Sequence, residues 1–243
     1  MIRTAWFYVV LVVSSVVHAT AVIVAALVGV RRRPGGIYDW GTTDWSRQLL
    51  RAAGTPVRVS GLERIPAGPV VFASNHSSMF DIWALAATLP GSVRFVAKQE
   101  LARVPLVGRA MLTAGHIVID RAHPARALEG YQRAADVLRS GISAVVFPEG
   151  TRSRTGELLP FKNAPFGLAI AAQAPVVPVY VRDTFTILAK GRRRLRPRPI
   201  RIAIGDPVST TGMTLEGRRA LRDRVRADVL ALQARVDADA SGR

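Results

Sequence analysis

Hydrophobic positions along the chain form short β-rich runs separated by longer segments with helical spacing. The runs that predict strands are 57–60, 70–73, 92–97, 116–119, 143–147, 176–181 and 200–204. The segments that predict helices are 44–53, 78–87, 124–139, 164–172 and 215–237. Strands that alternate with helices are typical of βαβ units. The pattern therefore predicts an α/β domain with a mostly parallel central sheet flanked by helices.

The last predicted helix has a clear apolar stripe. Between residues 215 and 237, apolar side chains recur every three or four positions, at Leu221, Val225, Val229, Leu232 and Val236. Arginines occupy the other faces. A single stripe of this width is typical of a helix that packs one side on a core. We therefore expect a packing helix with a solvated basic face rather than a specific partner site.

The N-terminal segment is long and apolar. Residues 5–30 carry no formal charge, and at ~1.5 Å per residue such a helix exceeds the roughly 30 Å of a bilayer core. This predicts a membrane helix. Polar residues interrupt the segment, so a second interpretation is a helix that lies in the membrane interface or turns back on itself. An Ala-Thr-Ala sequence at 19–21 leaves a cleaved signal peptide as a third interpretation.

Basic residues and a helix break follow this segment. Three arginines occupy 31–33, and Pro34-Gly35-Gly36 comes directly after them. The positive-inside rule then places the remainder in the cytoplasm. We predict a membrane-anchoring segment over 1–33 and one catalytic domain over 34–243, at the cell membrane with the domain on the cytoplasmic side. The 243 residues suffice for one substantial core.

The composition points to a polyanionic partner. The chain has 34 Lys and Arg against 17 Asp and Glu, a formal charge of +17, which suits phospholipid headgroups, nucleic acid or a phosphorylated substrate. The arginine-rich segment 192–198 is either a solvated loop or a contact for anionic headgroups or coenzyme A phosphates. Only 7% of residues are aromatic and no base-stacking module is visible, which argues against nucleic acid. The absence of cysteine excludes a thiol nucleophile and a disulfide framework.

A histidine and an aspartate follow the second predicted strand. His76 lies just past its carboxyl end, where α/β domains usually place reactive groups. Asp81 comes five residues later, about 140° around an ideal helix at ~100° per residue, so the two can meet only if the chain turns between them. Ser78 is a suitable N-cap with Asp81 as its capping partner. The pair therefore predicts either a general base with its orienting carboxylate or a cap beside a loop histidine.

A second polar segment follows the strand 143–147. It reads Phe-Pro-Glu-Gly-Thr-Arg-Ser over 147–153, and a turn with backbone donors and a guanidinium suits a phosphate, although an ordinary surface turn has similar composition. No cluster of acidic ligands accompanies His76, so we predict no metal. The sequence has no Gly-x-Ser-x-Gly, which leaves a serine lipid hydrolase without a nucleophile elbow.

Four ordered motifs together resemble the lysophosphatidic acid acyltransferase family of glycerolipid synthesis, over roughly 45–207. The His-x4-Asp motif is His76 to Asp81, and the Phe-Pro-Glu-Gly-Thr-Arg-Ser block is intact. Ile-Asp-Arg at 119–121 and Val-Val-Pro-Val at 176–179 match the other two. One departure is that Asn163 and Ala164 follow the Phe-Lys pair, where the family often has a glycine. The conformation of that turn is left open.

The resemblance implies an O-acyltransferase in which His76 is the general base and Asp81 orients it. It implies transfer from acyl-coenzyme A or acyl-acyl carrier protein to 1-acylglycerol-3-phosphate at a phospholipid membrane, giving phosphatidic acid without a cofactor. Glycerol 3-phosphate or another lysolipid stays open as acceptor. The substrate-binding residues that it implies are Asn75, Lys98, Arg121, Glu149, Gly150, Thr151 and Arg152.

Overall fold

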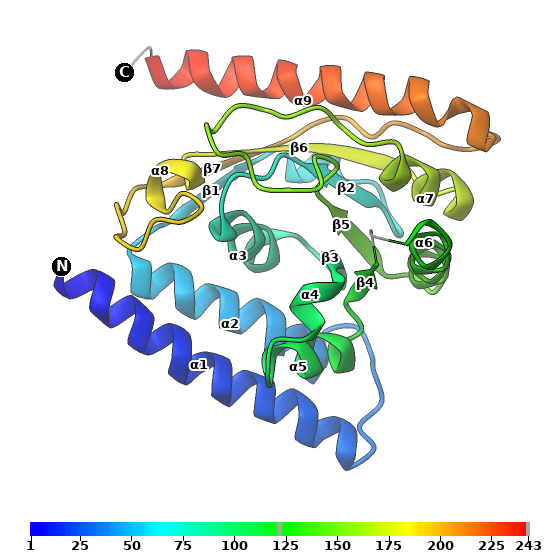
Figure 1. Cartoon of the computed structure of the whole chain (residues 1–243). Coiled ribbons are helices and arrows are strands. Elements are labelled where there is room, and N and C mark those ends of the chain that lie inside the picture. Colours follow the sequence, from blue (N-terminus) through cyan, green and yellow to red (C-terminus); the bar gives the residue numbers. More distant parts are fainter. Residues whose placement is uncertain (121–122, 242–243) are drawn as a thin grey trace.

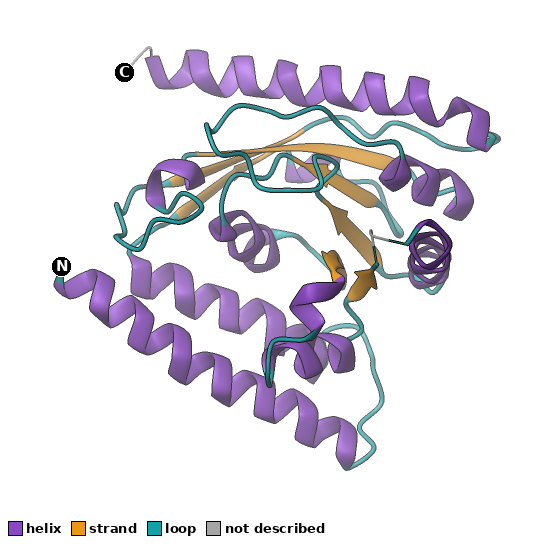
Figure 2. Ribbon diagram, viewed as in Figure 1, coloured by secondary structure: helices purple, strands orange, loops and turns teal. Residues whose placement is uncertain are grey.

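The computed structural model describes residues 1–120 and 123–241, and these contain a seven-stranded sheet between two helical layers (Figures 1 and 2). The sheet order is β1-β7-β6-β2-β5-β3-β4, with parallel pairing except between β6 and β7. The prediction of a mostly parallel sheet is confirmed, and every predicted strand end lies within one residue of the observed end. The strands are β1 (Val57–Ser60), β2 (Val71–Ser74), β3 (Val93–Lys98), β4 (Ile117–Ile119), β5 (Ser143–Val146), β6 (Val176–Arg182) and β7 (Ile200–Ile204).

The longer helices divide between the two faces of the sheet. On one face lie α1 (Ile2–Leu27), α2 (Ile37–Ala53) and α3 (Met79–Thr88). On the other lie α6 (Pro124–Arg139), α7 (Ala164–Ala172) and α9 (Arg218–Ser241), as Figure 1 shows. The shorter helical segments are η1 (Leu62–Arg64), α4 (Gln99–Ala102), α5 (Val107–Ala114), α8 (Thr184–Ile187) and η2 (Leu215–Gly217). Periodicity did not predict α4, α5 or α8, because such short segments hold too few turns to show it.

The central strand β2 separates the two hydrophobic cores. Phe72 points into the core formed with α1, α2 and α3, whereas Val71 and Ala73 point into the core formed with α6, α7 and α9. Side chains alternate between the faces of a strand, so a strand buried on both sides is apolar throughout. The predicted stripe of the last helix lies in the second core, which confirms that α9 is a packing helix.

The helix α1 shares the core of the domain. It is long and apolar enough to cross a membrane, yet one side packs against α2 and α5. Phe7 is fully buried, and its ring stacks on that of Phe80 with centroids 5.7 Å apart. The opposite side is apolar and exposed, with Val9, Val12, Val13, Val16, Val17 and Val24. The predicted boundary at residue 33 stays a prediction.

The helix α2 begins earlier than its sequence pattern predicts, at Ile37 instead of residue 44. Its first turns contain Gly41 and threonines, which have low helix propensity. Tertiary contacts stabilise them, because the buried Asp39 carboxylate accepts hydrogen bonds from Arg94 Nη1 at 2.6 Å and from the Ser92 hydroxyl. Helix formation here depends on partners far along the chain.

Candidate functional site

The loop between β2 and α3 brings His76 and Asp81 together. His76 lies in the loop at the carboxyl end of β2, and Asp81 lies in the first turn of α3. The Nδ1 atom of His76 is 2.9 Å from Oδ2 of Asp81. The chain turns between the two residues, as their spacing requires. A carboxylate only accepts hydrogen bonds, so this contact places the imidazole proton on Nδ1 and the lone pair on Nε2.

The Asp81 carboxylate also caps the N-terminus of α3. Asp81 is fully buried, and its Oδ2 accepts the backbone N–H groups of Ser77 at 2.7 Å and Ser78 at 2.8 Å. The Ser78 hydroxyl accepts from the N–H of Phe80, which completes a capping box. The Thr184 hydroxyl donates to Oδ1. The capping interpretation and the His–Asp interpretation of the sequence therefore describe one arrangement.

The segment 147–153 surrounds His76. The Phe147 ring stacks on the His76 imidazole, with centroids 4.0 Å apart and planes inclined by 17°. The carbonyl oxygen of His76 accepts the Ser153 N–H at 2.8 Å, and the His76 N–H donates to Oε1 of Glu149 at 2.6 Å. These contacts hold the ring and both polar groups of the peptide. The sequence pattern gave no indication of them, because they join parts of the chain about 70 residues apart.

Besides Glu149, two more of the predicted substrate-binding residues use polar atoms within the fold. Asn75 Nδ2 donates to the Val181 carbonyl at 2.9 Å, and Asn75 Oδ1 accepts the Val181 N–H at 2.7 Å. This amide therefore ties the loop after β2 to β6. Gly150 donates its N–H to the Phe147 carbonyl at 3.0 Å and has a φ of 76°. Glycine adopts this backbone conformation without steric cost, so Gly150 closes the turn after β5.

A cavity of about 470 Å³ adjoins His76. Basic groups contribute to its wall: Lys98 at the end of β3, Arg152 and Lys190. Thr151 also lines it. Arg121 lies outside the described residues. The sequence did not single out Lys190, which precedes an arginine-rich segment without a motif of its own. Most of the wall is apolar, with Trp45, Met79, Ile82, Trp83, Phe95, Val96, Leu101, Val107, Met111 and Phe147.

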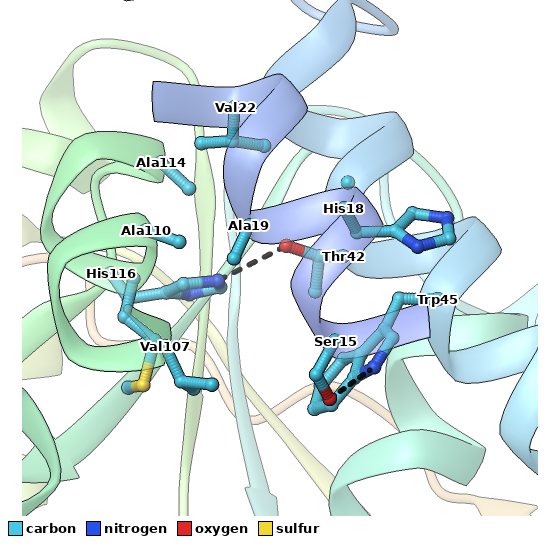
Figure 3. Close-up of a pocket in the computed structure, with 12 residues that line it drawn as sticks. Ser15, His18, Ala19, Val22, Thr42, Trp45, Val107, Ala110, Ala114 and His116 are labelled. Atoms are coloured by element: carbon cyan, nitrogen blue, oxygen red, sulfur yellow. Dashed lines mark hydrogen bonds between the residues drawn. The ribbon is translucent and has the colours of Figure 1, made fainter. Parts of the chain in front are cut away.

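A smaller cavity of about 70 Å³ lies between α1, α2 and α5 (Figure 3). It shares Thr42, Trp45, Val107, Met111 and His116 with the larger cavity, so the two adjoin. Figure 3 shows His116 hydrogen-bonded to Thr42, with Nε2 and Oγ1 3.1 Å apart. Burial lowers the pKa of His116 to about 3, and this histidine is therefore neutral near pH 7. The apolar space beside His76 thus extends toward the buried side of α1.

Comparisons with known proteins agree with this site. A family model described as Acyltransferase matches residues 56–182, which include both polar segments around His76. The chain belongs to the acyltransferase family. A coconut (Cocos nucifera) member named 1-acyl-sn-glycerol-3-phosphate acyltransferase is 34% identical over 74% of this chain and 58% of its own length. A human (Homo sapiens) member, 1-acyl-sn-glycerol-3-phosphate acyltransferase alpha, is 35% identical over 78% of this chain and 68% of its own.

A solved acyltransferase has the same fold. The crystal structure of the 1-acyl-sn-glycerophosphate (LPA) acyltransferase PlsC from Thermotoga maritima matches with a TM-score of 0.79 and 25% identity. The match covers 96% of this chain and 94% of that one. The likeness therefore includes α1 as well as the sheet and its covering helices. The chain spans less than two thirds of the length of the coconut acyltransferase.

The capping role of Asp81 predicts that Asp81→Ala destabilises the fold. It removes the acceptor of three buried donors, from Ser77, Ser78 and Thr184, and we expect the free energy of unfolding to fall by about 1–3 kcal/mol. His76→Ala should cost less, because it leaves that acceptor in place. Denaturant unfolding in detergent measures the free energy of unfolding of both variants, and Asp223→Ala, at an exposed aspartate, is the control. Equal losses for Asp81→Ala and Asp223→Ala would contradict the role.

Proposed function

We propose that this acyltransferase moves a fatty acyl group from acyl-coenzyme A or acyl-acyl carrier protein to the free hydroxyl of 1-acylglycerol-3-phosphate, giving phosphatidic acid. The observation that carries the proposal is the His76–Asp81 pair at the edge of an apolar cavity with basic groups in its wall. The names of the sequence relatives and of the solved neighbour support the acceptor. The pair supplies a base, and the cavity supplies room for an acyl chain.

The proposed reaction needs one base that takes and returns a proton. The lone pair on His76 Nε2 accepts the proton of the acceptor hydroxyl while its oxygen attacks the thioester carbonyl. The tetrahedral intermediate expels the thiolate, and His76 returns the proton to that sulfur. Asp81 stabilises the imidazolium between these steps and holds the ring in the reactive tautomer. An ester bond forms and the thioester bond breaks, without an acyl-enzyme.

The basic part of the wall suits the acceptor phosphate. Arg152 offers a planar fork of donors that matches a phosphate, and Lys98 and Lys190 add positive charge. Arg121 belongs to the proposed phosphate-binding residues because of its place in the Ile-Asp-Arg motif at 119–121. A phosphate bound here places the neighbouring hydroxyl of the glycerol near His76. Glycerol 3-phosphate and other lysolipids present the same groups, so they compete as acceptors in the assay.

The central prediction concerns His76→Ala. Loss of the base should lower acyl transfer by about 10²- to 10⁴-fold while the protein stays folded. The measurement is phosphatidic acid formed from labelled acyl-coenzyme A and 1-acylglycerol-3-phosphate by purified protein in vesicles, with acyl-acyl carrier protein and glycerol 3-phosphate as alternative substrates. A variant with wild-type turnover would contradict the proposed base. Wild-type protein that acylates only glycerol 3-phosphate would contradict the proposed acceptor.

We also propose that α1 attaches the protein to the cell membrane. Its exposed valines form an apolar face opposite the side that packs on α2 and α5. Transfer of such a face from water into the hydrocarbon region lowers the free energy. The arginines at 31–33 are exposed and suit anionic headgroups. By the positive-inside rule, the catalytic domain lies on the cytoplasmic side. The membrane is thus both the attachment site and the source of the lysolipid.

Val13→Glu tests this attachment. Burial of a valine contributes about 1.5–3 kcal/mol, and a carboxylate opposes insertion, so we expect flotation with phospholipid vesicles to weaken at least tenfold. Leu230→Glu is the matched control, because Leu230 is an exposed apolar residue of α9 on the opposite side of the molecule. Unchanged flotation of Val13→Glu, or equal loss in both variants, would contradict attachment through α1.

A further inference from the structure

Both oxygens of the Glu149 carboxylate accept hydrogen bonds from the protein itself. Its Oε1 accepts the N–H of His76 at 2.6 Å, and its Oε2 accepts the N–H of Leu159 at 3.1 Å. The side chain is only 3% exposed. Both donors are backbone groups from separate segments, one after β2 and one beyond the turn that follows β5. Glu149 therefore joins three parts of the chain at the point where the candidate base lies.

This contact complements the one made by Asp81. Asp81 fixes the orientation of the His76 ring through Nδ1, whereas Glu149 and Ser153 hold the two polar groups of the His76 peptide. A ring orientation alone does not place Nε2, because the ring moves with its backbone. The position of Nε2 relative to a bound hydroxyl therefore depends on both carboxylates.

A role for Glu149 in binding the acceptor phosphate is physically unfavourable. An ionised carboxylate has no donor to offer to a phosphate, and two anions in a poorly solvated site repel each other. Glu149 is also absent from the residues that line the cavity, which include its neighbours Gly150, Thr151 and Arg152. The motif places Glu149 beside the phosphate-binding residues, but its side chain points into the protein.

We propose that Glu149 is a positioning residue, whose ionised carboxylate holds the main chain of His76 so that Nε2 reaches the acceptor hydroxyl. The inference rests on the proposed function for its catalytic consequence. The positioning itself is a property of the loop 75–78 and can be measured without turnover.

The protonation state of Glu149 determines the strength of its hydrogen bond with the His76 N–H. A protonated carboxyl turns one acceptor oxygen into a donor, which then faces a backbone N–H. Burial raises the pKa of Glu149 to about 7; Asp81 adds to the increase, whereas the two backbone donors and Arg226 oppose it. The hydrogen bond that positions the His76 main chain therefore weakens as the pH falls through about 7. Because burial raises the pKa of Glu149 in the folded state above its ordinary 4.5, the contribution of this group to folding stability is greatest below pH 4.5. That contribution decreases as the pH rises toward 7.

The first test is Glu149→Gln with kinetics. The amide can accept only one of the two N–H groups, so we expect kcat to fall about 10- to 100-fold, since small displacements of a base are costly. The KM for 1-acylglycerol-3-phosphate should change less than threefold, whereas Arg152→Gln should raise it. Glu157→Gln, an exposed neighbour, is the matched control and should leave both constants unchanged. A tenfold higher KM with unchanged kcat for Glu149→Gln would overturn the proposal.

The second test needs no substrate. Hydrogen exchange read by mass spectrometry should be faster in the loop 75–78 of Glu149→Gln and unchanged in β6. Unchanged exchange in that loop would overturn the positioning role even if the wild type proves inactive on this acceptor. If the variant does not fold, the wild type serves: loop protection, corrected for the intrinsic pH dependence of exchange, should fall between pH 8 and 6. A constant corrected protection would overturn the proposal.

Discussion

The buried carboxylate of Asp81 is the interaction on which the site depends. An isolated charge buried in a protein is very costly, and Asp81 is tolerated because donors surround both of its oxygens. They come from His76, from the backbone groups of Ser77 and Ser78 just before α3, and from Thr184 after β6. Helix capping and orientation of the imidazole are therefore a single requirement. A change that removes the charge disturbs the local fold and the base together.

The sheet topology explains why distant motifs meet at this point. The strand β2 pairs with β5 and β6 on its two sides, and all three run in parallel. Their carboxyl ends lie at one edge, so the loops that begin near 75, 147 and 183 converge there. Phe147 and Glu149 arrive from β5, and Thr184 arrives from β6. The order of the strands, more than the motifs themselves, assembles the site.

The sequence predicts the strands and the main residues of the site, but only part of their roles. The short β-rich runs located the seven strands of the described residues, and the spacing of His76 and Asp81 required the turn that the structure contains. Three features were not predictable: the contact from Thr184, the two hydrogen bonds to the Glu149 carboxylate, and the place of Lys190 in the cavity wall. Each depends on residues brought together by the sheet, and no local pattern encodes such a pairing. The early start of α2 has the same cause.

The tautomer of His76 tests the central claim most directly. With ¹⁵N-histidine in the protein, NMR distinguishes a protonated Nδ1 from a protonated Nε2, and His76→Ala assigns the signal. For the neutral imidazole, the arrangement around Asp81 predicts a proton on Nδ1 and a bare Nε2, with Asp81→Asn shifting the population toward the other tautomer. A proton on Nε2 in the wild type would contradict the role of His76 as the base.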